Sequence, residues 1–336
     1  MSVINQIPTD RDIKRMTAEI DAAVERIAAV RRSIGTVIYG QTLVVDQALI
    51  TILSGGHGLL VGVPGLAKTK LVETLGVVLG LQERRVQFTP DLMPSDILGS
   101  EVLEQSAEGV RSFRFLPGPV FTQLLMADEI NRASPRTQSA LLQAMQEYHV
   151  TVAGVRHDLP GPFHVLATQN PLEQEGTYPL PEAQLDRFLL QIDVHYPDRD
   201  AEHRMLLETT GADEARAEPV LAATELRELQ QLVRRLPVGE SVVKAILDLV
   251  RSARPGEIAD KRFADAIAWG PGPRASQALM LASRARALLD GRYAPSVDDV
   301  HALALPVLQH RMALSFAARS EDLTLRDVIG TLASRL

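Results

Sequence analysis

Apolar residues recur at helical spacing near the start of the chain. This period predicts one amphipathic helix over residues 12–34, ended by Gly35, and it is set by Ile13, Met16, Ile20, Val24, Ile27 and Ile34. Further helices are predicted over residues 43–53 and 68–79. Between the second and third of these predicted helices lies a short segment that is rich in glycine.

Short apolar runs bounded by glycine or turn residues alternate with these helices and predict buried strands. The predicted strands cover residues 59–61, 85–88, 124–127, 163–167 and 189–194. Strands that alternate with helices favour right-handed crossovers and a mostly parallel sheet with helices on both faces. The predicted fold class is therefore α/β with a five-stranded sheet.

Two stretches depart from this alternation. Residues 89–119 form a connection longer than a crossover requires, so we expect an insertion there. Ser134 and Pro135 have the residue types of an N-cap and a first helical position and predict a helix. Residues 150–155, which include Gly154, then predict one arm of a hairpin.

The pattern of apolar residues along the chain changes after residue 211. Residues 212–223 are rich in Ala, Glu and Pro without an apolar period and are expected to form a linker. Beyond them the pattern is helical throughout, with capping boxes at Ser296 with Asp299 and at Thr324 with Asp327. An α/β unit followed by a small all-helical unit is the predicted organisation.

The composition narrows the class of protein. The 336 residues include no Cys, which excludes disulfides, thiolate metal sites and a thiol nucleophile. This suits a reducing compartment, and no apolar run approaches the roughly 18 residues that cross a bilayer, so we expect a cytoplasmic protein. A net charge of −7 argues against non-specific nucleic-acid binding. We expect the arginine doublets at 31–32, 84–85 and 234–235 to lie on helix surfaces.

A glycine-rich loop follows the first predicted strand and precedes a helix. It reads GVPGLAKT over residues 62–69, where backbone N–H groups converge on a phosphate at a helix N-terminus. We expect nucleotide phosphates to contact Gly62, Pro64, Gly65, Leu66, Ala67, Lys68, Thr69 and Lys70. Lys68 would contact the β- and γ-phosphates, and Thr69 would place its hydroxyl on Mg²⁺. The alternative is a glycine turn that only links strand to helix.

One residue of this loop departs from the P-loop consensus. The position before Lys68 is Ala67 rather than Gly. A β-carbon is tolerable there if the residue has negative φ. We therefore expect Ala67 in the ordinary right-handed region, with any positive φ at Gly65.

Two later strands end in polar residues that would reach the same sheet edge. Asp128 and Glu129 follow an apolar strand, and parallel strands share one crevice at their carboxyl ends. Asp128 can hold Mg²⁺ and Glu129 can activate the attacking water; the alternative is a helix cap. Asn170 follows the next strand and can bind the γ-phosphate and this water, although Asn before Pro171 is also a common turn residue.

Longer stretches carry a family resemblance over nearly the whole chain. They read QFTPDLMPSDILG (87–99), GPVF (118–121), ADEINRASP (127–135) and GTYPLPEAQLDRF (176–188). In these stretches the sequence resembles the MoxR family of AAA+ ATPases. The resemblance implies an N-terminal helix over 1–34, an α/β core over 35–211, a linker over 212–223 and a helical lid over 224–336. Within the core it implies a helix-2 insert at 89–119 and a pre-sensor-1 hairpin at 148–162, both facing a ring pore or a partner.

The resemblance also implies roles for individual residues. Residues 37–41, with Tyr39, Gly40 and Gln41, would line the adenine pocket. The loop at 62–69 would be the Walker A motif, Asp128 and Glu129 the Walker B pair, and Asn170 the sensor 1 residue. Arg187 would be the arginine finger that reaches the γ-phosphate of a neighbouring subunit, and Arg274 would be the sensor 2 residue.

The function implied is a ring ATPase with chaperone-like activity. ATP and Mg²⁺ are the expected cofactors, and the expected partners are identical subunits in a hexamer and a protein with a von Willebrand factor A domain. The reaction would remodel or mature that protein, for example by metal or cofactor insertion. Two alternatives remain, namely a nucleotide-gated scaffold with little turnover and a nucleic-acid motor.

Overall fold

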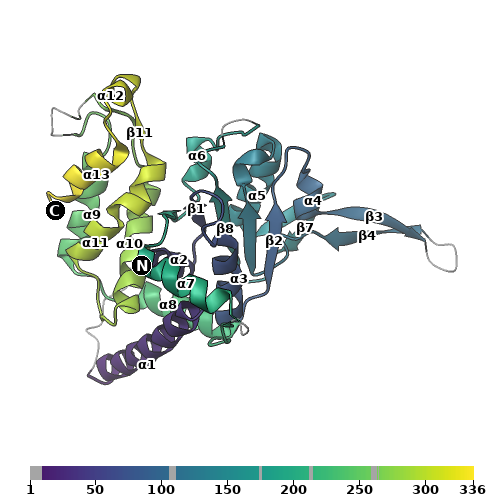
Figure 1. Ribbon diagram of the computed structural model, residues 1–336, viewed down its shortest axis with the longest axis horizontal. Helices are drawn as coiled ribbons and strands as arrows, with labels where there is room; N and C mark the ends of the chain where they lie inside the picture. Colours follow the sequence, from purple (N-terminus) through teal and green to yellow (C-terminus); the bar gives the residue numbers. More distant parts are fainter. Residues whose placement is uncertain (1–9, 106–110, 174–175, 212–214, 259–262, 264) are drawn as a thin grey trace, which may run out of the picture.

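A parallel sheet of five strands lies at the centre of the molecule, in the order β2-β5-β8-β1-β9 (Figure 1). The computed structural model describes residues 10–105, 111–173, 176–211, 215–258, 263 and 265–336. The strands of this sheet are β1 (Gly58–Val61), β2 (Glu83–Gln87), β5 (Leu124–Asp128), β8 (His164–Gln169) and β9 (Leu190–Asp193). The five strands predicted from the apolar runs are thus confirmed, with ends shifted by one or two residues.

Helices cover both faces of the sheet because alternate strand residues point to opposite sides. Leu124 and Met126 of β5 pack with one group of helices, whereas Leu125 and Ala127 pack with another. The first group is α1 (Asp10–Gly35), α2 (Thr42–Leu53) and α3 (Lys68–Val78). The second group is α4 (Pro94–Leu98) and α5 (Pro135–Glu147), and the short helices η1 (Ile130–Arg132) and α6 (Glu182–Leu185) lie near the sheet edge. The predicted start of α5 is confirmed, since Ser134 caps it and Pro135 is its first residue.

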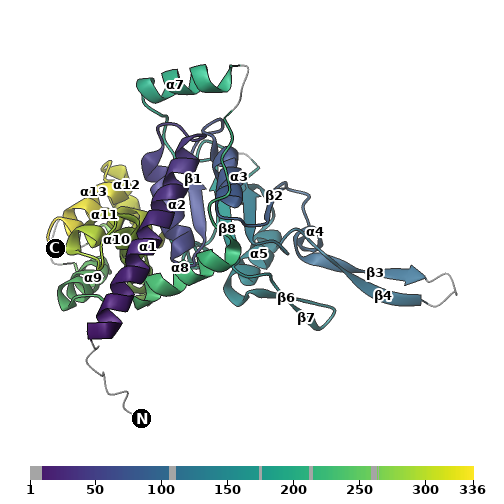
Figure 2. The same ribbon diagram turned by 90° about the horizontal axis from the view of Figure 1, so that it is seen from below.

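The insertion after β2 contains α4 and a hairpin of β3 (Gly99–Gln105) and β4 (Arg111–Pro117), which projects from the body (Figures 1 and 2). At its root two backbones touch, because a β-carbon on Gly118 would lie 2.5 Å from the Gly99 nitrogen. A second hairpin, β6 (His149–Val152) with β7 (Val155–Asp158), lies beside it. The two are joined where the Phe115 ring stacks on His157, with centroids 3.9 Å apart.

After β9 the chain forms α7 (Arg199–Thr209), which stands apart from the sheet (Figure 2). Residues 215–222 then run without regular structure but are held against the core. The backbone N–H groups of Val220 and Leu221 donate to Val78 O, each at 3.0 Å. The Ser33 hydroxyl donates to Glu218 O at 2.9 Å and accepts from Glu218 N at 3.1 Å. The described part of the expected linker is therefore fixed to α1 and α3; residues 212–214 lie outside the described part.

The C-terminal unit, here called the lid, is a bundle of helices. These are α8 (Ala223–Arg235), α9 (Glu240–Ser252), α10 (Pro273–Leu289), α11 (Val297–Leu308), η2 (Gln309–Arg311), α12 (Phe316–Ser320) and α13 (Leu325–Ala333). Both predicted capping boxes are present. The helical pattern did not predict a short antiparallel ribbon of β10 (Ile267–Trp269) and β11 (Ala313–Leu314).

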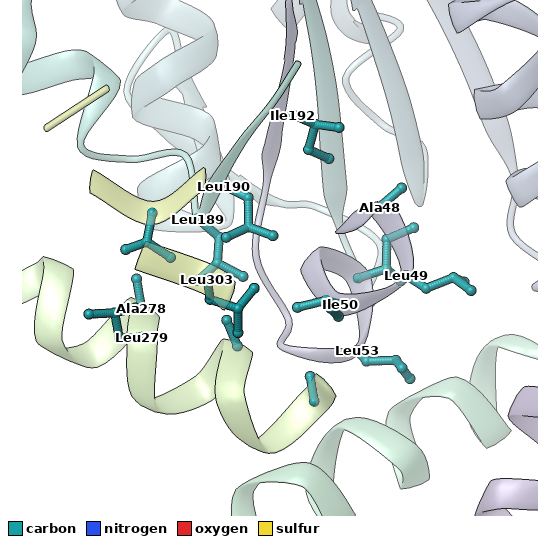
Figure 3. Packing of buried hydrophobic residues seen from close by; sticks show 14 of the residues in the cluster. Ala48, Leu49, Ile50, Leu53, Leu189, Leu190, Ile192, Ala278, Leu279 and Leu303 are labelled. Atoms are coloured by element: carbon teal, nitrogen blue, oxygen red, sulfur yellow. The ribbon is translucent and has the colours of Figure 1, made fainter. Parts of the chain in front are cut away.

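The lid and the sheet share one hydrophobic cluster (Figure 3). It includes Leu49 and Leu53 of α2, Leu190 of β9 and Leu279 of α10. Burial of apolar area of this kind contributes about 25 cal/mol per Å². None of the helices in the described ranges is both long and apolar enough to cross a bilayer.

Candidate active site

The loop between β1 and α3 is the first component of the site. Gly62 passes so close to β9 that a β-carbon there would lie 2.7 Å from Val194 O, so only glycine fits. Lys68 begins α3, and its ammonium donates to the carbonyl oxygens of Gly62 and Val63 in the same loop. Burial lowers the pKa of Lys68, and the carboxylates of Asp128 and Glu129 oppose that shift. The lysine is thus held over the loop, beside two carboxylates.

The prediction for Ala67 is wrong. Ala67 has φ 55° and ψ 21°, which lies in the left-handed region. Gly65 also has positive φ, at 84°. The physical reason is that an anion-binding loop needs successive N–H groups turned to one side, which alternation of right- and left-handed residues provides. Ala67 is exposed, so its methyl group meets no steric barrier beyond the local backbone strain.

The structure brings the predicted phosphate and metal residues together. A cavity of about 470 Å³ is lined by Pro64, Gly65, Leu66, Ala67, Lys68, Thr69, Lys70, Arg85, Gln87, Asp128, Glu129, Thr168 and Asn170. Asn170 is buried, and its Oδ1 accepts from Leu172 N at 3.1 Å. Asn170 therefore performs the turn role that was its alternative interpretation and also lies at the cavity wall.

Two adjacent carboxylates occupy one side of this cavity. Asp128 Oδ1 accepts from the Thr168 hydroxyl at 2.5 Å, and the same hydroxyl accepts from Glu129 N at 2.9 Å. Glu129 has φ 53°, which turns the chain sharply at the end of β5. Its Oε2 accepts from Gln87 Nε2 at 2.7 Å and from an Arg132 nitrogen at 3.0 Å. Thr168 thus fixes the geometry of the pair, although no sequence pattern singled it out.

Arg85 also reaches this pair, which corrects an expectation from the sequence. The doublet at 84–85 lies on strand β2 and not on a helix surface. Arg85 donates from Nε at 3.1 Å and from a terminal nitrogen at 2.5 Å, both to Asp128 Oδ2. It also donates to Gln87 Oε1 at 3.0 Å. Residues 85 and 87 share a face of β2, so the edge strand supplies two polar groups to the carboxylates.

A second cavity, of about 270 Å³, adjoins the loop on the side of α7. Its wall includes Tyr39, Gln41, Leu66 and Met205. Gly40, at φ 67°, lies where a β-carbon would meet Ala201 of α7 at 2.2 Å. Gln41 donates to Leu66 O at 3.2 Å, and its buried Oε1 has no hydrogen-bond partner among the described residues. This cavity is mostly apolar with one open acceptor, as expected for a planar base that carries an amine.

The two predicted arginines lie elsewhere. Arg187 and Arg274 line a separate cavity of about 280 Å³ between the core and the lid, together with His57 and Tyr148. Neither lines the cavity around Lys68. Arg187 Nε is buried without a hydrogen-bond partner in the described part of the chain, and burial together with Arg274 lowers its pKa. Arg187 has no ion pair with Asp186 or Glu182 there, which was its alternative interpretation.

These features define a class of protein. A phosphate-binding loop after the first strand, acidic residues at the end of β5 and a helical lid are the features of a P-loop ATPase. Comparison with known proteins agrees. Residues 57–190 match the model of the ATPase family associated with various cellular activities (AAA), and residues 259–330 match the AAA lid domain.

Similarity to individual proteins identifies the family within this class of ATPases. The chain is 40% identical to Chaperone MoxR1 of Mycobacterium tuberculosis over 94% of its own length and 81% of that protein. It is 32% identical to Protein MoxR of Paracoccus denitrificans over 83% and 86% of the two chains. A crystal structure from Cytophaga hutchinsonii matches with 36% identity and a TM-score of 0.89, covering 96% of this chain and 98% of the other. The chain belongs to the MoxR family of AAA+ ATPases.

Proposed function

We propose that this protein hydrolyses Mg²⁺-bound ATP as a ring of identical subunits and acts on a protein partner as a chaperone-like factor. The observation that carries the proposal is the placement of Arg187 and Arg274. They line a cavity apart from the subunit's own loop, with Asp186 as the carboxylate that lines it with them. Such a cationic cavity suits the phosphates of a neighbouring subunit.

The residues around Lys68 fit both cofactors. The open Gln41 Oε1 would accept from the adenine amine. Thr69 and Asp128 offer hydroxyl and carboxylate oxygens, the ligand type that Mg²⁺ prefers alongside phosphate and water. When bound, Mg²⁺ would supply charge neutralisation at the β- and γ-phosphates.

Within one subunit, separate groups of the chain would bind the phosphates and activate the attacking water. The N–H groups of residues 62–69 and the Lys68 ammonium would bind the phosphates. Glu129 would accept a proton from the attacking water, and Asn170 would orient that water. In this structure Gln87 and Arg132 both donate to Oε2 of Glu129, so Oε1 is the oxygen left to accept this proton.

The arginines would complete the site from the next subunit. A guanidinium supplied in trans stabilises charge on the transferring phosphoryl group and makes hydrolysis depend on a closed, head-to-tail ring. Arg187 would act as the finger. Because Arg274 lines the same cavity, we assign it to the same neighbouring site rather than to its own subunit's nucleotide. A hexamer is the ring size that we propose from the family resemblance.

The test is complementation between two inactive variants. Arg187→Ala should bind nucleotide normally but turn over about 10³-fold more slowly. Lys68→Ala subunits still carry Arg187, so mixing the two should restore part of the activity, because a Lys68→Ala subunit can serve an intact loop on its neighbour. Absence of rescue over a range of mixing ratios would contradict the assignment and direct attention to Arg132.

For the partner, we propose a protein with a von Willebrand factor A domain that is matured by metal or cofactor insertion. Support comes from the family resemblance and from the name of the mycobacterial relative, a chaperone. The β3–β4 hairpin exposes Leu103 and Phe113, which are paired across its strands. Glu129→Gln with ATP should capture the partner, and adding Leu103→Asn and Phe113→Asn should abolish capture but not nucleotide binding. Recovery of the ATPase alone would favour the scaffold alternative.

One observation does favour that alternative. Gln87 and Arg132 both donate to Oε2 of Glu129 and restrain its carboxylate. A subunit fixed in this state would bind ATP and assemble without turnover. Measured phosphate release by the wild-type ring decides between the two functions.

A further inference from the structure

Arg85 has no role in the function described so far, yet among the described residues it donates two of the three hydrogen bonds to the Asp128 carboxylate. It lies on β2, the edge strand, which is paired along its length with β5. Its guanidinium donates two hydrogen bonds to a single oxygen of Asp128, Oδ2, at 3.1 Å and 2.5 Å. Charge-assisted bonds of this kind are roughly twice as strong as neutral ones.

The remaining capacity of Asp128 is small. A carboxylate has about four acceptor sites. The Thr168 hydroxyl takes one on Oδ1 and Arg85 takes two on Oδ2. One site on Oδ1 remains open, so a metal ion or its bound water that takes Oδ2 competes with Arg85.

The two partners differ in how easily they move. The Asp128 side chain is 12% exposed, whereas that of Arg85 is 48% exposed. Asp128 is held in place by Thr168, whereas about half of the Arg85 side chain already faces solvent. Exchange of the cation at Asp128 therefore requires only the movement of Arg85.

We propose that Arg85 is a positioning residue that occupies Asp128 as a counter-ion until Mg²⁺ replaces it, and so sets the Mg²⁺ concentration that nucleotide binding requires. This inference rests on the proposed role of Asp128 as a metal ligand. In the metal-free state Arg85 offsets the charge of Asp128, whereas Arg132 pairs with the adjacent Glu129. Without Arg85 the carboxylates would attract Mg²⁺ more strongly.

The exchange would also reach Glu129. Arg85 donates to Gln87 Oε1 at 3.0 Å, and Gln87 donates from Nε2 to Glu129 Oε2 at 2.7 Å. When Arg85 leaves Asp128, Gln87 loses a neighbour that fixes its amide. The metal site and the base are thus joined through two side chains of one strand.

The test measures binding, not turnover. A fluorescent ADP analogue is titrated into full-length protein at a series of free Mg²⁺ concentrations and in EDTA. For Arg85→Met we expect the half-saturating Mg²⁺ concentration to fall about tenfold, which corresponds to about 1.4 kcal/mol, while the affinity in EDTA does not rise, because Asp128 then lacks its counter-ion beside the phosphates. Arg85→Lys keeps the charge without the paired bonds. Its half-saturating Mg²⁺ concentration should therefore lie between those of the wild type and Arg85→Met.

Arg84→Met is the matched control, because Arg84 is the exposed neighbour whose side chain points to the other face of β2. It should leave the Mg²⁺ dependence unchanged. An unchanged or higher Mg²⁺ requirement in Arg85→Met would overturn the inference. So would an equal loss of affinity with and without Mg²⁺, because that result would place Arg85 on a phosphate. Thermal unfolding of each variant confirms that it is folded.

Asp128→Asn separates this inference from the proposed function. If Asp128→Asn binds the analogue with wild-type Mg²⁺ dependence, Asp128 is not the metal ligand and both ideas fail. If Asp128→Asn raises the Mg²⁺ requirement while Arg85→Met does not lower it, only the role of Arg85 is refuted.

Discussion

Arg311 of the lid and Asp186 of the core form an ion pair, with 2.7 Å between Nε and Oδ1. The Arg311 side chain is 3% exposed and also donates to the carbonyl oxygens of Leu189, Val307 and Phe188. This pair joins the end of α11 to the segment before β9. Asp186 Oδ2 also lies 3.9 Å from an Arg274 nitrogen, and the adjacent Arg187 lines the same cavity.

Replacement of Arg311 by Met should therefore destabilise the fold. Loss of one partner of a buried pair leaves the other charge and several carbonyl groups unsatisfied, and typically lowers the free energy of unfolding by about 3 kcal/mol or more. Urea unfolding measures this change. Arg319→Met, at an exposed position of α12, is the control and should change it by less than about 0.5 kcal/mol. Equal values for the two variants would mean that the pair has no structural role.

Ala67→Gly should stabilise the protein. Ala in the left-handed region costs about 1 kcal/mol more than Gly, and this exceeds the entropy that Gly adds to the unfolded chain. The expected gain is on the order of 0.5–1 kcal/mol, read from the thermal midpoint. Gly65→Ala, two residues earlier and also at positive φ, should show the opposite sign. A loss of stability in Ala67→Gly would indicate that the methyl group makes a contact of its own.

Two buried histidines should make stability depend on pH. Burial lowers the pKa of His57 to about 3 and that of His164 to about 4. Both rings are used as neutral groups, since His57 Nδ1 accepts from Val165 N while Nε2 contacts Met145 O. Because the unfolded chain binds protons near pH 6.5, their contribution is complete above that pH and is lost as the pH falls toward 4.

The slope is the measurable quantity. For each unit by which the pH falls within this window, each histidine should lower the free energy of unfolding by about 1.4 kcal/mol. Unfolding in urea at pH 7.0, 6.0 and 5.0 gives the combined slope. His164→Asn should reduce it, whereas His301→Asn, at an exposed position of α11, should not. A wild-type slope in His164→Asn would assign the effect to other groups.

Glu129→Gln should separate chemistry from binding. The amide cannot accept the proton of water, so turnover should fall by a factor of about 10² to 10⁴. Nucleotide affinity should stay near the wild-type value, because Glu129 lies beside the phosphates without being expected to bind them. Phosphate release and fluorescent nucleotide binding give the two quantities, with Glu321→Gln, on an exposed part of the lid, as control. Unaltered phosphate release would rule out Glu129 as the base.

The sequence predicted the strands and the loop at 62–69 well, because burial and glycine punctuation are local signals. It did not predict the conformation of Ala67, which depends on how the N–H groups of the whole loop converge. Arg85 and Gln87 were missed for a different reason. Their contacts follow from the pairing of β2 with β5, in which Gln87 lies opposite Asp128, and such register is not visible in a single strand.

Other parts of the site needed three-dimensional proximity. His57 and His164 are scattered in the sequence and become neighbours only where β1 and β8 begin. The resemblance implied a sensor 2 role for Arg274 without showing which subunit's site it serves, and the structure places it in one cavity with Arg187, where the lid packs against the start of β9. The roles of both arginines remain predictions until complementation is measured.

The narrow root of the β3–β4 hairpin has a mechanical consequence. Where the backbones at Gly99 and Gly118 touch, no side chain can deform to absorb a load applied at the far end. The hairpin would therefore behave as a stiff lever, whose displacement passes through α4 to α5, the helix on which α4 packs.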